Sequence, residues 1–360
     1  MTSSRLASAL VPISLVAAAS LLAACSGESS SNASEESAGP GSSTVVATTT
    51  ILGSIAGDIV ACADPAATVT TLMPVGADPH DFAPSSQQVA QIVQADLVIA
   101  NGLGLEAGLD DALDNARSDG ATVLEIAELV DPIPFGEHAD DHADDHADDH
   151  ADDHADEAAT EDEHADDHAD DHADEAATED EHDHGSEDPH VWFDMTRMAT
   201  AAELIGAQLA TTGGTAYAEC GTEVADRIRA AEAEVRATLE SVPADRRILV
   251  TDHDALGYLA DAYGYEIAGT VIPSGTTLAE PSSADLAELV SVIVAEGVPA
   301  IFANSAEPST LADAVAAETG RDVQVVTLYV GSLGEPGSGA EDYLSMMATD
   351  ANLIATALTR

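Results

Sequence analysis

The sequence contains no lysine: its ten basic residues are all arginine, against 67 aspartate and glutamate residues. The formal net charge at pH 7 is −57. An excess of this size opposes nucleic acid and anionic membrane surfaces as partners and is compatible with the attraction of cations. It is equally what a salt-tolerant organism produces across its whole proteome. The net charge therefore argues against nucleic acid as a partner, but it does not identify the partner that the protein has.

Long apolar runs are also absent after the N-terminal segment, so no later stretch approaches the roughly 20 apolar residues of a membrane span. Arg5 precedes the largely apolar segment 6–22, and small residues then lead to Cys25, as at the cleavage site of a lipoprotein. We predict a signal peptide over 1–24, a lipidated Cys25 and a flexible tether over 25–43. An ordinary secretory signal with an incidental cysteine is the alternative. The mature chain is expected outside the cytoplasm, held at the membrane by its lipid.

Cysteine is scarce, with three residues in 360. If Cys25 carries the anchor, Cys62 and Cys220 remain as an even pair in an oxidising compartment. We predict a disulfide between Cys62 and Cys220 that ties the end of a first helix to the turn before a long one. Two separate buried thiols are the alternative.

Histidine is distributed very unevenly. Three of the 13 histidines, His80, His190 and His253, stand far apart in the chain, and the other ten lie in one acidic tract. The ten are His138, His142, His146, His150, His154, His164, His168, His172, His182 and His184.

The acidic tract is assigned to residues 137–188, which hold 26 of the 67 acidic residues. Its segments 146–164 and 164–182 are identical copies that share a histidine. Such duplication, with few apolar residues, predicts disorder in the absence of metal. Many of the histidines recur every four residues, which on a transient helix brings neighbours to one face. We predict an auxiliary zinc-collecting loop; a solvated acidic spacer is the alternative.

Outside the tract, short apolar runs alternate with longer amphipathic ones. This pattern predicts an α/β fold with two mostly parallel sheets flanked by helices. Strands are expected at 44–50, 67–73, 96–100 and 121–126, then at 247–251, 265–271, 300–303 and 323–328. Helices are expected at 51–61, 85–95, 105–118, 195–210, 215–240, 254–263, 282–296, 309–319 and 340–358.

The domain assignment follows these elements. We place an N-terminal lobe at 44–194, connecting helices at 195–241 and a C-terminal lobe at 242–360. The helix 215–240 would measure about 39 Å, long enough to cross both lobes.

The three isolated histidines occupy similar places. His80 and His190 each close an Asp-Pro-His tripeptide, and His253 lies in Thr251-Asp252-His253-Asp254 after an apolar run. Open α/β sheets bind ligands at the carboxyl ends of their strands. Three neutral imidazoles suit zinc, whereas manganese prefers oxygen. Asp78 and Asp188 are candidates to orient imidazole rings; plain turn chemistry is the alternative.

These motifs resemble those of the zinc-binding, solute-binding lipoproteins of bacterial metal ABC importers. The resemblance rests on segments 75–81, 188–192 and 252–258, on the acidic insertion, and on glycine-rich and Tyr-Leu-Ser-Met-Met motifs at 334–347. It implies two α/β lobes joined by one long rigid helix, with metal bound in the cleft by His80, His190 and His253. It also implies a monomer that delivers Zn²⁺ to a permease and an ATPase. Manganese-binding relatives have glutamate at the place of His253, which makes Mn²⁺ the weaker candidate.

One position departs from the family pattern. Where the family commonly supplies an aspartate as fourth ligand, this chain has Gly331. Water, Glu335, Glu280 or a group from the tract remain as alternatives for the fourth position.

Two other functional classes are considered. Three histidines plus water also describe a catalytic zinc, but the sequence has no His-Glu-x-x-His motif to place a general base, so we do not expect an enzyme. A surface metal-binding adhesin fits the acidity and the tether, but it leaves the three isolated histidines unexplained.

Overall fold

The structure, a computed structural model, describes residues 44–135 and 187–360. Its first sheet is entirely parallel, in the order β2-β1-β3-β4. The strands are β1 (Val45–Ala47), β2 (Val69–Thr71), β3 (Leu97–Ala100) and β4 (Thr122–Glu125), and the helices between them are α1 (Thr50–Ala63), α2 (Ser86–Val93) and α3 (Asp110–Asp119).

The second sheet repeats this arrangement in the order β6-β5-β7-β8, again with parallel pairs. Its strands are β5 (Ile248–Thr251), β6 (Glu266–Thr270), β7 (Ala300–Asn304) and β8 (Gln324–Leu328). The helices are α6 (Gly257–Tyr263), α7 (Ser283–Glu296), α8 (Thr310–Glu318) and α9 (Tyr343–Leu358). The predicted fold class, two parallel α/β lobes, is confirmed.

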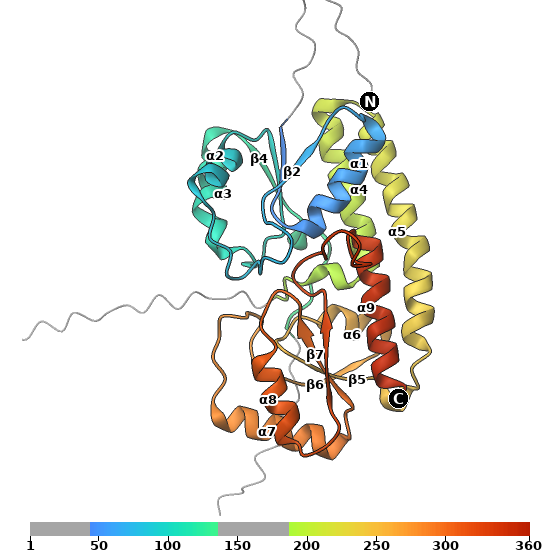
Figure 1. Cartoon of the computed structure of the whole chain (residues 1–360). Coiled ribbons are helices and arrows are strands. Elements are labelled where there is room, and N and C mark those ends of the chain that lie inside the picture. The colour runs from blue at the N-terminus through green and yellow to red at the C-terminus, as the bar shows by residue number, and fades with distance from the viewer. Residues whose placement is uncertain (1–43, 136–186) are drawn as a thin grey trace, which may run out of the picture. The chain divides into compact units, whose positions relative to one another are not determined.

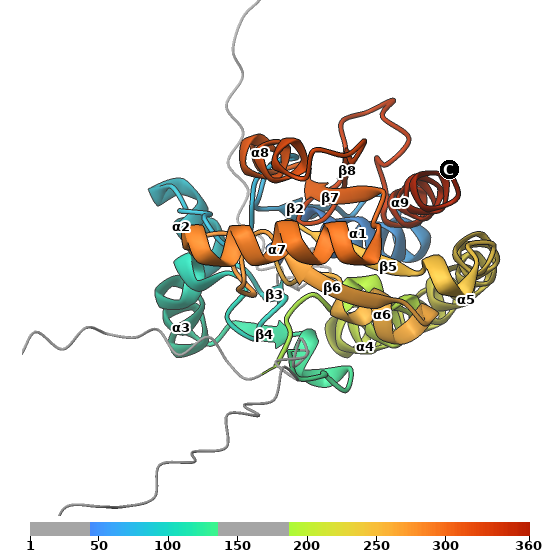
Figure 2. The same ribbon diagram turned by 90° about the horizontal axis from the view of Figure 1, so that it is seen from below.

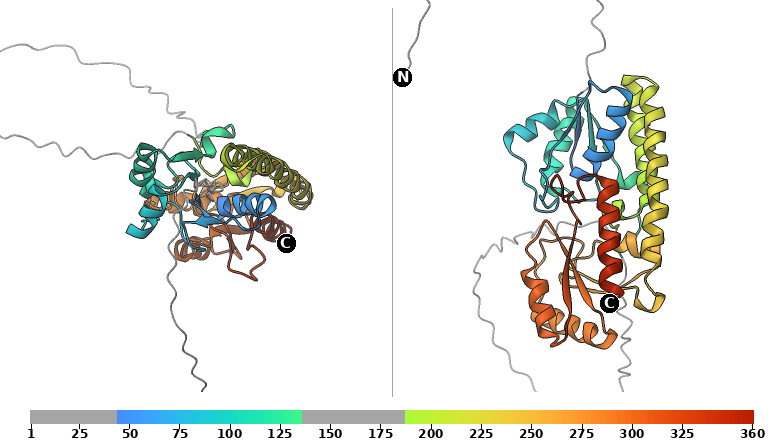
Figure 3. Two further views of the ribbon diagram at one scale, coloured as in Figure 1. Left: turned by 90° about the horizontal axis from the view of Figure 1, so that it is seen from above. Right: turned by 45° about the vertical axis from the view of Figure 1, so that its right-hand side comes forward.

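Two connecting helices, α4 (Met195–Gly213) and α5 (Ala216–Glu240), lie between the two sheets in sequence. The longer helix, α5, contacts α1 of the first lobe and α6 and α9 of the second. Figures 1 and 3 show α5 running past both sheets. The helices α4 and α5 approach closely at a pair of glycines, because a Cβ on Gly206 would lie only 2.7 Å from the Cα of Gly221.

Alternation along the strands gives each sheet two buried faces. In β1, Val45 and Ala47 face a core shared with α1, α4 and α5, whereas Val46 faces α2 and α3. In the second lobe, Val250 and Ile301 face α7 and α8, and Figure 2 shows α7 lying across this sheet. The opposite face joins the shared core through α6 and α9. The core packed around α5 is therefore continuous through both lobes.

Three predicted helices begin later than expected, and one of them is α9, which begins at Tyr343 and not at residue 340. The segment expected to be helical from residue 105 becomes an α-helix only at Asp110, because the Glu106 carboxylate turns back to accept the backbone N–H groups of Asn101 and Gly102. The helix expected from residue 254 begins at Gly257. There the N–H of Asp254 is instead bonded to the carbonyl of Ser274.

The base of the insertion also differs from the sequence assignment. Glu187 pairs with Pro134 in an antiparallel bridge, and the N–H of Asp188 donates to the carbonyl of Ile133 at 2.8 Å. Asp188 is buried. Glu187 and Asp188 therefore belong to the folded body and not to the tract in which the sequence placed them.

Cys62 and Cys220 form a disulfide across 158 positions of sequence. Cys62 lies near the end of α1, as expected, but Cys220 lies inside α5 and not in the turn before it. The bond thus joins two helices directly. No helix within residues 44–135 and 187–360 is long and apolar enough to cross a membrane.

Candidate metal site

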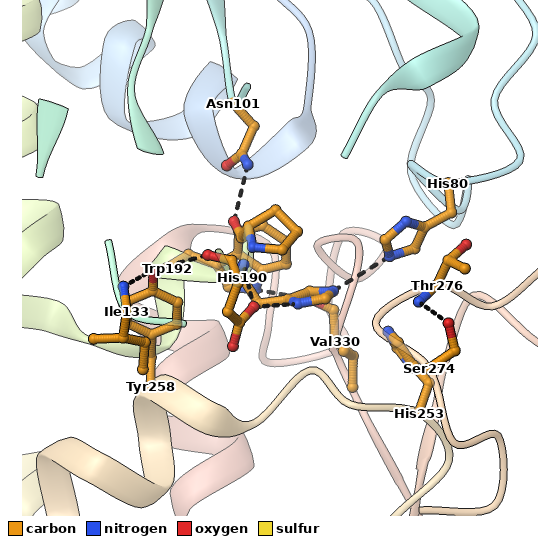
Figure 4. A network of polar contacts seen from close by, with 12 residues as sticks. His80, Asn101, Ile133, His190, Trp192, His253, Tyr258, Ser274, Thr276 and Val330 are labelled. Carbon is orange, nitrogen blue, oxygen red and sulfur yellow. Dashed lines mark hydrogen bonds and ion pairs between the residues drawn. The ribbon is translucent and has the colours of Figure 1, made fainter. Parts of the chain in front are cut away.

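The structure brings the three isolated histidines together. His80 comes from the loop after β2, His190 from the segment before α4, and His253 from the turn two residues after β5. One nitrogen of each ring lies within 4.8 Å of the others, and the ring centroids are 5.3–5.6 Å apart. His190 and His253 are each only 1% exposed. Figure 4 shows the three rings converging.

The strand order explains the position of His253. In the second sheet the chain reverses its direction of travel between β5 and β7, and side chains after those two strands meet at the crevice that such a reversal creates. His253 follows β5, and its neighbour Asp252 accepts the N–H of Asn304, the last residue of β7, at 2.9 Å. His80 follows β2 at the corresponding edge of the first sheet.

Carboxylates engage two of the rings. Asp188 Oδ1 lies 2.7 Å from His190 Nδ1 and also accepts the backbone N–H of His190. Asp252 Oδ1 lies 3.1 Å from His253 Nδ1. Such partners fix the orientation and the tautomer of an imidazole. They leave His190 Nε2 facing His80 Nε2, at 3.2 Å.

Asp78 has a different set of contacts. Its carboxylate accepts the backbone N–H of His80 at 3.1 Å and the hydroxyl of Thr277, a residue of the second lobe. This is the turn chemistry that the sequence left open, combined with a contact between lobes.

The protonation equilibria of the two buried rings differ. Burial, followed by the charge of His253, sets the pKa of His190 well below its ordinary value, which favours the neutral ring. Burial also opposes protonation of His253, but the hydrogen bond and charge of Asp252, with the charges of Asp78 and Asp254, raise its pKa above the ordinary value. Burial raises the pKa of Asp188 well above its usual range.

Gly331 packs against the loop that carries His80. A Cβ at this position would lie 2.9 Å from Cδ of Pro79, so an aspartate there would require this loop to shift. Among the described residues the cluster consists of the three histidines alone. Glu280 and Glu335 are exposed and are not members of it.

The remaining predicted site residues lie outside the described residues. They are Cys25, His138, His142, His146, His150, His154, His164, His168, His172, His182 and His184.

No role was predicted for several residues around the cluster, although Trp192, Asp252 and Tyr258 lie within the motifs at 188–192 and 252–258. The rings of Trp192 and His190 pack edge-to-face, with centroids 5.3 Å apart, and Trp192 Nε1 donates to the carbonyl of Val330. Asp252 is adjacent to His253 in the sequence, and this adjacency was the signal that its carboxylate could contact the His253 ring. Asn101 and Tyr258 contact the segment of His190 from distant parts of the sequence.

The two sheets and the helix that spans them define a two-lobed α/β binding-protein fold. A family model described as zinc-uptake complex component A, periplasmic, matches residues 45–357. The chain belongs to this family.

Named relatives agree with this assignment. The chain is 28% identical over 322 residues to the zinc-binding protein TroA of Treponema pallidum, covering 86% of this chain and 88% of TroA. It is 22% identical over 311 residues to the manganese-binding lipoprotein MntA of Halalkalibacterium halodurans, covering 85% and 87% of the two chains.

Solved structures show the same fold. The periplasmic zinc-binding protein TroA of Treponema pallidum superimposes with a TM-score of 0.68 at 26% identity, over 89% of this chain and all of that one. A manganese-bound periplasmic metal-binding protein from Candidatus Liberibacter asiaticus gives a TM-score of 0.65 at 22% identity, over 88% and 99% of the two chains.

Proposed function

We propose that this protein captures Zn²⁺ outside the cytoplasm through His80, His190 and His253 and delivers it to the permease and ATPase of an ABC importer. The family and the named relatives support the coarser statement that it is the extracytoplasmic metal-binding component of an ABC transporter. The observation that carries the proposal is the convergence of three imidazoles, two of them buried and held by carboxylates.

The choice of metal rests on donor chemistry, because the relatives include proteins named for zinc and for manganese. Imidazole nitrogens suit zinc, and manganese is bound preferentially by carboxylate, carbonyl and water oxygens. The described cluster contains nitrogen donors and no carboxylate. Zn²⁺ is therefore the proposed substrate, and Mn²⁺ is the second candidate.

Binding for transport is favoured over catalysis and over adhesion. The relatives are named as binding proteins and transporter components, not as enzymes. A surface adhesin would have no need of a nearly enclosed cluster of imidazoles. Water is our choice for the fourth zinc position, since Gly331 has no side chain to offer and a Cβ there would lie 2.9 Å from Cδ of Pro79.

Two accessory features complete the proposal. Cys25 is the lipidated N-terminus of a monomeric protein. The intact mass of membrane-extracted protein will test the lipidation of Cys25. The histidine-rich tract is an auxiliary collector that holds zinc more weakly than the cluster and exchanges it faster.

The function is tested by zinc titration of the full-length chain against a chelator strong enough to empty weaker sites. Wild-type protein should retain one Zn²⁺, and His253→Ala should weaken this site at least tenfold, because one of its ligands is lost. Asn352→Ala, on the exposed side of α9, should bind like wild type. Unchanged affinity in His253→Ala, or stronger retention of Mn²⁺ than of Zn²⁺, would contradict the proposal.

A further inference from the structure

A side-chain hydrogen bond from each lobe holds the segment that carries His190. We propose that the donors of these bonds, Asn101 and Tyr258, are positioning residues that fix His190 before the metal arrives. This inference rests on the proposed function, since it assumes that His190 is a ligand. Figure 4 shows Asn101 and Tyr258 near the segment that carries His190.

Asn101 acts from the first lobe. It follows β3, is 1% exposed, and donates from Nδ2 to the carbonyl of Pro189 at 2.9 Å. Its own position is set by the buried Glu106 carboxylate, which accepts the N–H groups of Asn101 at 2.8 Å and Gly102 at 3.1 Å. The same carboxylate accepts the hydroxyl of Thr48, just after β1, at 2.6 Å. The donor is thus tied to the ends of two neighbouring strands.

Tyr258 acts from the second lobe. It lies in α6, is fully buried, and donates its hydroxyl to the carbonyl of Asp188 at 2.8 Å. The same oxygen accepts the N–H of Ile133 at 3.1 Å. Since Ile133 and Asp188 are also hydrogen-bonded to each other, one hydroxyl fastens both chain segments at the base of the insertion.

The hydrogen bonds from Tyr258 and Asn101 are accepted by the carbonyls of the two residues that directly precede His190. Proline at 189 has no N–H and a restricted φ angle, so its backbone can accept a hydrogen bond through the carbonyl but cannot donate one. With both carbonyls fixed and Asp188 bonded to the His190 ring, the imidazole has little freedom left to search for the metal. Because one donor belongs to each lobe, the orientation of His190 depends on the position of the two lobes relative to each other.

The test removes each of these hydrogen bonds with little change in side-chain volume. Tyr258→Phe deletes the hydroxyl and keeps the ring, and Asn101→Asp replaces the donor by an oxygen that repels the Pro189 carbonyl. Each change should weaken zinc binding about tenfold, the lower end of the effect seen when a group that orients a metal ligand is removed. Tyr265→Phe is the matched control, because it loses a buried hydroxyl that donates to the Leu239 carbonyl at 2.8 Å, away from the cluster. It should bind zinc like wild type.

A second background separates positioning from general weakening of the fold. In His190→Ala protein, measured against a weaker chelator, adding Tyr258→Phe should cause no further loss of affinity, because the hydroxyl acts through the missing ring. An equal loss in both backgrounds would overturn the inference, as would wild-type affinity in the Tyr258→Phe single variant. If wild-type protein itself retains no zinc, the proposed function fails instead. Tyr258→Phe decides the matter alone if Asn101→Asp does not fold.

Discussion

His190 and His253, each in contact with a carboxylate, are not equivalent. His190 is packed against Trp192 and held by Asp188, and its pKa is lowered by burial. His253 is equally buried, yet its pKa is raised because Asp252 and neighbouring carboxylates outweigh the effect of burial. Since a protonated imidazole cannot ligate metal, protons should compete with zinc at His253 before they do so at His190 as the pH falls.

The Asp252→Asn variant tests this order. Without the charge of Asp252 the pKa of His253 should fall, so the loss of zinc affinity on acidification should begin at a lower pH than in wild type. At pH 8 the variant should bind zinc about tenfold more weakly, because the ring is less basic and less firmly held. Chelator competition between pH 5 and 8.5 measures both effects.

The control is Asp322→Asn, which makes the same change at an exposed position before β8. Its pH profile should match wild type. Superimposable profiles for Asp252→Asn and wild type would show that Asp252 has no influence on the ring.

Among the elements, the disulfide sets the strongest constraint on the contact between α1 and α5. It closes a loop of 158 positions, and a cross-link over so long a loop removes many conformations from the unfolded chain. Cys62→Ser with Cys220→Ser should therefore lower the free energy of unfolding by about 2–5 kcal/mol. Denaturant unfolding of the variant, compared with oxidised and reduced wild type, measures the change.

Reduced wild type should match the double variant. Peptide mapping of native protein under non-reducing conditions should recover the linked pair of peptides. Two free thiols in that map would exclude the bond.

The sequence predicted most elements because their signals are local. Strand β3 is a short apolar run, and α7 begins where Ser282 and Asp285 form a reciprocal cap. The histidine cluster was predictable because its three members are the sole histidines outside the tract. The starts of α3 and α6 were not, since buried contacts of Glu106 and Asp254 decide them.

The side chains of Asn101 and Tyr258, which hold the segment of His190, could not be predicted from local sequence signals. Asn101 is 88 positions from Pro189, and Tyr258 is 70 positions from Asp188. Neither an asparagine nor a tyrosine in a sequence indicates that its side chain positions a metal ligand. Folding of the N-terminal lobe brings Asn101 to Pro189, and Tyr258 reaches Asp188 only where the two lobes meet.

For the molecule as a whole, the insertion leaves and re-enters the body at one place. The bridge between Pro134 and Glu187 and the bond between Ile133 and Asp188 bring its two ends together. Removal of residues 137–185 would join these ends through Phe135, Gly136 and Ser186, a length that hairpin loops commonly have. The body should therefore fold without the tract.

We predict that this deletion lowers the total number of zinc ions bound and leaves the single tight site unchanged. Calorimetric titration of both proteins measures stoichiometry and affinity together, and growth in zinc-poor medium tests the need for a collector. Equal stoichiometry would mean that the tract binds no zinc. Loss of the tight site would mean that the tract supplies its fourth ligand.

The disulfide also decides what a protease can do to this protein. The tract lies wholly between Cys62 and Cys220 in the sequence, so a cut within it opens a covalent ring and releases no fragment. His80 would remain attached to His190 and His253 through the sulfur bridge, although the backbone between them was broken. A protein nicked in this way would migrate as one species until it was reduced, and it would keep all three imidazoles in the same molecule.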